Sequence, residues 1–148
     1  MRVFMLTLSL FFFGSAQAQA QEAPKVTPHA VVHADGAKTQ VTPSGKAKIT
    51  HLARGQNAYL GRLELAPGAK VPLHRDATEE YIHFLSGGGV ITVDGKAHTV
   101  KAGSTVYMPA KAEVTYTNGD QATVAIQVFA GPAPAAKYEK WPLVSGQK

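Results

Sequence analysis

Short runs of apolar residues, broken at regular intervals by turn residues, make up most of this chain. The runs are rich in Val, Ile, Thr and Tyr, and no stretch keeps a helical period over several turns. The runs are residues 49–54, 58–66, 71–75, 80–86, 90–93, 97–100, 105–109, 114–118 and 123–129. Closely spaced short strands of this kind predict an all-β domain, built as a sandwich or a barrel.

The residues between the runs support this interpretation, because they are the ones that turns require. The sharpest case is Asp94-Gly95, which predicts a two-residue hairpin whose backbone needs positive φ angles. We find no internal repeat and no second domain, so residues 46–130 are expected to form one barrel. Residues 21–45 form a polar, Pro-containing lead-in, in which we expect a short strand near residues 30–33.

The two ends of the chain differ from this pattern. Residues 131–148 form a Pro-rich tail, which we expect to pack on the barrel through Tyr138 and Trp141 or to contact a second subunit. Residues 1–20 begin with Arg2, continue as an apolar run and end in small residues, with cleavage sites after Ala18 or Ala20. This layout is typical of a secretory signal peptide.

The alternative for the first residues is a membrane anchor, but the apolar run is well short of the roughly 20 residues that a span needs. We therefore expect a periplasmic or secreted protein that has no membrane association after cleavage.

The composition excludes several further classes. The chain has no Cys, which rules out a disulfide scaffold, a thiolate metal site and a Cys nucleophile. Its 15 Lys and Arg residues are scattered singly, so we expect no nucleic-acid partner.

The residues that carry candidate chemistry lie between Gly68 and Gly87. Within this stretch, His74, Asp76 and Glu80 stand at spacings that resemble the first motif of the cupin family, in which two His and a Glu follow a Gly. A second cupin motif is matched more loosely from Gly95 onward, and the resemblance covers residues 58–129. It implies a double-stranded β-helix, which is a small jelly-roll barrel.

The resemblance also implies a metal ion inside the barrel, held by the two His and the Glu and by a further His from the second motif. Carried onto this chain, the first His is His74 and the Glu is Glu80. Asp76 stands at the second His position, and Val114 stands at the position of the last His. Two of the usual ligands are therefore replaced, one of them by a residue that cannot bind a metal.

The alternation of side chains along a strand gives a second, independent prediction of which residues face the barrel interior. Residues two apart on a strand face the same side, so His74 and Asp76 are expected to point together. If Glu80 points inward, His83 faces the opposite side and cannot replace the missing ligand. The apolar wall of the predicted pocket then consists of Ile82, Phe84, Val114 and Tyr116.

The predicted donor set is rich in oxygen, and two interpretations of it remain open. One imidazole and two carboxylates can hold Mn, Fe or Zn, with water completing the coordination shell. Without a metal, two inward carboxylates are costly unless they share a proton or pair with a cation. A protonated His74 between Asp76 and Glu80 would supply that cation.

These observations favour an exported cupin-domain protein that binds a small molecule, either through a weak divalent-metal site or without metal. A first alternative is a metal-dependent cupin enzyme of the dioxygenase, isomerase or lyase type. If the protein is an enzyme, Glu80 is the candidate general base. A second alternative is a structural or interaction barrel with a decayed site. The resemblance further implies a homodimer formed through the barrel edges.

Overall fold

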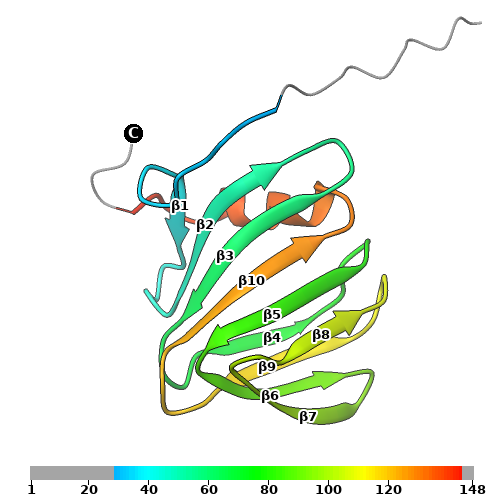
Figure 1. The fold of residues 1–148 in the computed structure, drawn as a ribbon. Helices are drawn as coiled ribbons and strands as arrows, with labels where there is room; N and C mark the ends of the chain where they lie inside the picture. Colours follow the sequence, from blue (N-terminus) through cyan, green and yellow to red (C-terminus); the bar gives the residue numbers. More distant parts are fainter. Residues whose placement is uncertain (1–28, 145–148) are drawn as a thin grey trace, which may run out of the picture.

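The computed structural model describes residues 29–144, so the predicted signal peptide and its cleavage sites lie outside the described residues. The described chain is built from two antiparallel sheets that close around a common core (Figure 1). The strands are β1 Thr39–Val41, β2 Ala47–Arg54, β3 Tyr59–Leu65, β4 Lys70–His74, β5 Glu80–Ser86, β6 Gly88–Val93, β7 Lys96–Lys101, β8 Thr105–Met108, β9 Val114–Asn118 and β10 Thr123–Phe129. The predicted all-β class is confirmed.

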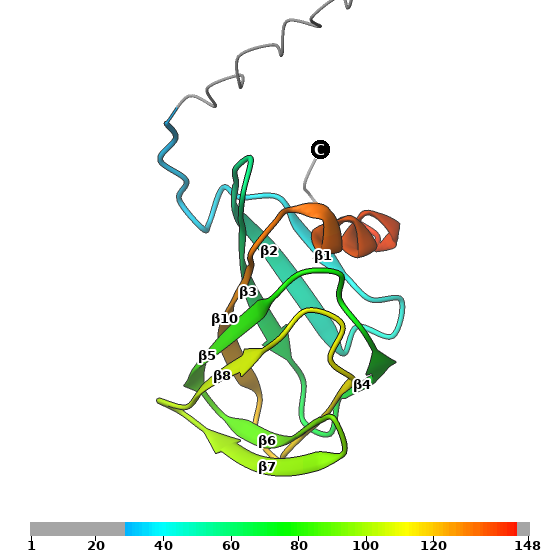
Figure 2. The same ribbon diagram turned by 90° about the vertical axis from the view of Figure 1, so that its right-hand side faces the viewer.

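The larger sheet has six strands in the order β1-β2-β3-β10-β5-β8, and the smaller sheet has four in the order β4-β9-β6-β7. Strands that are distant in sequence therefore lie side by side, as β3 and β10 do and as β4 and β9 do. Figure 2 shows the two sheets around the barrel interior. This arrangement is consistent with the predicted jelly-roll barrel.

The core follows from side-chain alternation along the strands. Inward side chains on β3, β5 and β10 are buried, while their neighbours are half-buried or exposed. The most deeply buried large side chains include Ile49, Tyr59, Ile91, Met108 and Phe129, which come from both sheets and close the space between them. Burial of these apolar side chains is the main force that holds the sheets together.

The turn chemistry also follows the sequence. Asp94 and Gly95 both have positive φ angles, 46° and 77°. They form the turn between β6 and β7, and the residues on either side of it, Val93 and Lys96, are paired across the two strands. The predicted hairpin is therefore confirmed. The short strand of the lead-in lies elsewhere than predicted: residues 30–33 form no strand, and β1 begins at Thr39 instead. There it pairs with β2 in antiparallel fashion.

The tail leaves β10 and forms a 3₁₀ helix, η1, over Ala133–Lys140. In both views η1 lies at the end of the molecule away from β6 and β7 (Figures 1 and 2). Beyond η1, the Val41 amide donates to the Pro142 carbonyl at 2.9 Å, and Gln40 pairs with Leu143 in an isolated bridge. Among the residues that the structure describes, no helix has the length and apolar character needed to cross a membrane.

Candidate ligand site in the barrel

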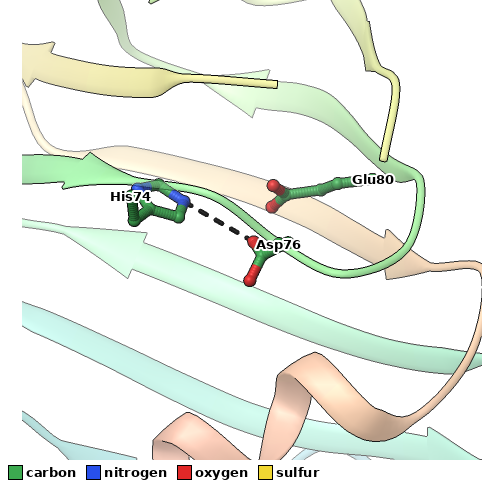
Figure 3. Close-up of side chains that lie close together, drawn as sticks. All are labelled: His74, Asp76 and Glu80. Carbon is green, nitrogen blue, oxygen red and sulfur yellow. Dashed lines mark ion pairs between the residues drawn. The ribbon is translucent and has the colours of Figure 1, made fainter. Parts of the chain in front are cut away.

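Three candidate site residues come together where β4 leads into β5. His74 is the last residue of β4, Asp76 lies in the following loop, and Glu80 is the first residue of β5 (Figure 3). Each offers a ligand atom, and these atoms all lie within 4.8 Å of one another. His74 Nε2 is 3.5 Å from Asp76 Oδ2, and Glu80 is buried, with 3% of its surface exposed.

These residues line one part of a cavity of about 540 Å³ inside the barrel. The side chains that line the remainder are mostly apolar and include Leu63, Leu65, Ile82, Phe84, Ile91, Val114, Tyr116 and Ala125. The four residues predicted as the pocket wall are all among them. His83 points away from the cavity, as strand parity predicted, and its Nδ1 lies 2.8 Å from the Thr105 hydroxyl on the outer face.

Side chains from outside the motif complete the polar end of the cavity. Lys137 of η1 donates to both oxygens of Asp76, at 3.0 and 2.9 Å. The Tyr138 hydroxyl donates to Gln127 Oε1, and Gln127 Nε2 donates in turn to Glu80 Oε1. The predicted His74, Asp76 and Glu80 are thus joined to a tail and to a strand, β10, that the motif does not include.

Sequence reasoning missed Lys137, Gln127 and Tyr138 as site residues. Strand parity carries a signal for Gln127, because it lies two residues from the buried Phe129 on the same face of β10. The sequence has no comparable signal for Lys137. The direction of a side chain in a Pro-rich tail depends on where the tail docks, and no local period determines that.

The charges of the site are set by burial and by these contacts. Burial raises the pKa of Glu80 above its usual value, although the hydrogen bond from Gln127 opposes this. For Asp76 burial acts in the same direction, but hydrogen bonds from His74 and Lys137 outweigh it and lower the pKa. The hydrogen bond to Asp76 raises the pKa of His74 against the effect of burial. Asp76 is therefore the firmly ionised carboxylate of the site.

Comparison with known proteins identifies the domain. The cupin domain family, which the sequence motif resembled, matches residues 61–129. The match spans 69 of the 148 residues, just under half of the chain. The fold agrees, because the structure resembles an RmlC-like cupin from Shewanella frigidimarina with a TM-score of 0.64. The two are 14% identical, over 70% of this chain and 92% of that one.

Two further proteins are similar to this chain, one in fold and one in sequence. A predicted oxalate decarboxylase from Thermotoga maritima has a TM-score of 0.61 at 22% identity, over 69% of this chain and 99% of that one. The dimethylsulfoniopropionate lyase DddW of Ruegeria pomeroyi is 36% identical over 61 residues. That match covers 41% of this chain and 40% of the lyase, so it spans well under half of each protein. The likeness to the two solved structures concerns the fold, and the likeness to the lyase concerns a part of the sequence.

Cupins often bind a metal. The contacts that His74, Asp76 and Glu80 already make show whether a metal ion would fit between them. The His74, Asp76 and Glu80 atoms are close enough to share an ion. Both oxygens of Asp76, however, already accept from the Lys137 ammonium, and Glu80 Oε1 accepts from Gln127. A divalent ion at Asp76 would lie within a few ångströms of that fixed positive charge. In this arrangement the residues do not suit a divalent metal.

Proposed function

We propose that this cupin domain binds a small organic molecule inside the barrel. The observation that carries the proposal is the cavity of about 540 Å³, whose walls are mostly apolar and whose polar groups converge at one end. Apolar walls with a few convergent polar groups are the usual composition of a small-molecule site. The bound molecule would place an apolar part against Phe84 and Val114 and a polar group near His74 and Glu80.

Two comparisons support a small-molecule role. The lyase and the predicted oxalate decarboxylase are both named for small organic compounds, and both share sequence or fold with this domain. The cavity of this domain has a volume in the range of sites that hold small ligands.

A pair of matched variants tests the proposal. Val114→Phe places a ring inside the cavity, whereas Val90→Phe places the same ring on the outside of the neighbouring strand β6, where Val90 is 44% exposed. The probes are the fluorescent anion anilinonaphthalene sulfonate and short-chain carboxylates such as octanoate, followed by fluorescence and by thermal stabilisation.

We expect the wild-type protein and Val90→Phe to bind a probe, and Val114→Phe to bind it about tenfold or more weakly, because the ring fills the space that the probe needs. Circular dichroism would check that both variants fold. Equal binding by the two variants would contradict the proposal, because the probe would then lie outside the barrel.

A metal-dependent reaction of the lyase type is the second candidate. The convergence of His74, Asp76 and Glu80 within 4.8 Å favours it, but it requires the Lys137 ammonium to leave Asp76 when the ion binds. When bound there, Mn, Fe or Zn would supply Lewis-acid chemistry. Glu80 is the residue placed to exchange a proton with a bound molecule, because its carboxyl group faces the cavity. Metal content by mass spectrometry, in wild-type protein and in His74→Ala, separates this candidate from the first. Near-stoichiometric metal that disappears in the variant would favour it.

We also propose that the protein is exported to the periplasm or secreted, on the evidence of the sequence pattern in residues 1–20. The test is N-terminal sequencing of the protein recovered from periplasmic and culture fractions. A mature chain that begins at Gln19 or Gln21 is expected. A chain that still begins at Met1 would contradict export with cleavage.

A further inference from the structure

Lys137 brings a positive charge to the polar end of the cavity. Its ammonium nitrogen lies 2.9 and 3.0 Å from the two oxygens of Asp76, whose side chain is only 12% exposed. The two residues are 61 positions apart in the chain, so this contact exists only because the tail docks over the β4–β5 loop.

The neighbours of Lys137 hold it in this position. Tyr138, the next residue, is buried, and its hydroxyl donates to Gln127 on β10. The Lys137 ammonium also lies 4.8 Å from the centre of the Phe129 ring, a distance at which a cation is attracted to an aromatic face. The ammonium is therefore held by a carboxylate on one side and by aromatic rings on the other.

Removal of this ammonium would change the charge balance of the site. Asp76 and Glu80 would then be two carboxyl groups near the imidazole of His74, with no ammonium in contact with Asp76. Arg75 also lines the cavity, but its guanidinium donates to Lys111 and Glu113. Such a donor set attracts divalent ions, whereas the same set with an ammonium in contact repels them.

We propose that Lys137 is the resident cation of this site and excludes divalent metals from it, so that replacing Lys137 with a neutral residue creates a metal-binding site on His74, Asp76 and Glu80. The inference concerns the preference of the site for cations. It does not depend on which small molecule the cavity binds. The probe experiment above can therefore fail while this inference holds, and this inference can fail while the cavity still binds the probe.

The test is a titration of the full-length protein with Co²⁺, followed by calorimetry and by the visible absorption of the bound ion. Lys137→Met keeps an unbranched side chain without the charge, and Lys137→Gln replaces the ammonium with a neutral amide. The matched control is Lys140→Met, which removes a charge from an exposed position on the same helix. A double variant, Lys137→Met with His74→Ala, removes the imidazole ligand.

We expect Lys137→Met and Lys137→Gln to bind one Co²⁺ about tenfold or more tightly than the wild-type protein, because a neighbouring positive charge has been removed. Lys140→Met should behave as wild type, and the double variant should lose the gain. The inference is overturned if wild-type protein binds Co²⁺ as tightly as the two Lys137 variants. It is also overturned if neither folded variant binds more tightly than Lys140→Met.

Discussion

Glu80 is the most deeply buried charged side chain of the site, and its surroundings favour the protonated form. The Gln127 amide donates to its carboxyl group, but burial has the larger effect and raises its pKa. The folded protein therefore holds a proton on Glu80 at pH values where the unfolded chain has released it. Stability from this group is lost as the pH rises from the unfolded pKa toward the folded one.

Replacing Glu80 with Gln should consequently stabilise the protein at neutral pH. The Gln side chain has the same shape, keeps an oxygen that can accept from Gln127 and carries no charge. We expect a gain on the order of 1 kcal/mol at pH 8 and a smaller one at pH 5. Urea unfolding of both proteins at the two pH values measures it. A variant that is less stable than wild type at both values would show that the Glu80 charge is well compensated.

His51 has a tautomer that the surrounding hydrogen bonds define. Gln40 Nε2 donates to the Trp141 carbonyl at 2.7 Å, so Gln40 Oε1 accepts from His51 Nε2 at 2.8 Å. His51 Nδ1 then accepts from the Tyr59 hydroxyl at 2.9 Å. This network uses both ring nitrogens of a neutral imidazole, and burial lowers the pKa of His51.

We predict that His51 is neutral at pH 7, with its proton on Nε2, and that it titrates below its usual pKa. Protonation of Nδ1 would break the hydrogen bond from Tyr59. The stability that His51 contributes is therefore present above the unfolded pKa of 6.5 and is lost as the pH falls from there toward the folded pKa. An NMR titration of the imidazole ¹⁵N and ¹H shifts measures both features. A midpoint above 6.5, or a proton on Nδ1, would contradict the prediction.

At the scale of elements, the strands could be predicted from the sequence and the tail could not. The inward position of Glu80, Ile82 and Phe84 follows from a period of two along β5, and the same rule places Val114 inward on β9. These rules are local. The contact between Lys137 and Asp76 is not local, because it joins residues 61 apart through a tail with no regular period. The cluster of three residues was therefore predictable, but its fourth charged member was not.

The corner between β5 and β6, where the chain passes from one sheet to the other, depends on Gly88. Its φ angle is 148°, and a Cβ atom there would lie 2.8 Å from the Lys101 Cα and 2.9 Å from the Val100 carbonyl carbon. Gly68 is a matched comparison, since its φ angle is 64° but a Cβ atom there would have no neighbouring atom within 4 Å. The two glycines thus separate backbone strain from a steric clash.

We predict that Gly88→Ala destabilises the protein by about 2 to 4 kcal/mol, because strain and clash add. Gly68→Ala should cost only about 1 kcal/mol, which is the cost of the left-handed conformation alone. Chemical unfolding of the two variants beside wild type provides the measurement. Equal losses would show that the corner relaxes around the added methyl group.

For the whole molecule, the tail acts as the element that closes the barrel. It brings Lys137 and Tyr138 to the polar end of the cavity, and Trp141 also lines that cavity. Past η1, the Val41 amide bonds to the Pro142 carbonyl, and the Val144 amide bonds to the Thr39 carbonyl. The tail is therefore attached to β1 by backbone hydrogen bonds and to the site by side chains. Both attachments are lost together if the tail is removed.

A chain that ends at Gly131 should lose about 3 kcal/mol of stability or more, as removal of one large buried aromatic side chain already costs that much. It leaves Gln127 and Asp76 without their partners from η1 and opens the cavity to water. Thermal unfolding measures the loss. The control is Glu139→Gln, which removes only an exposed pair with Arg54 at 3.5 Å and should leave the unfolding temperature unchanged. A truncated chain that unfolds at the wild-type temperature would show that the barrel is complete without its tail, and that η1 serves the site alone.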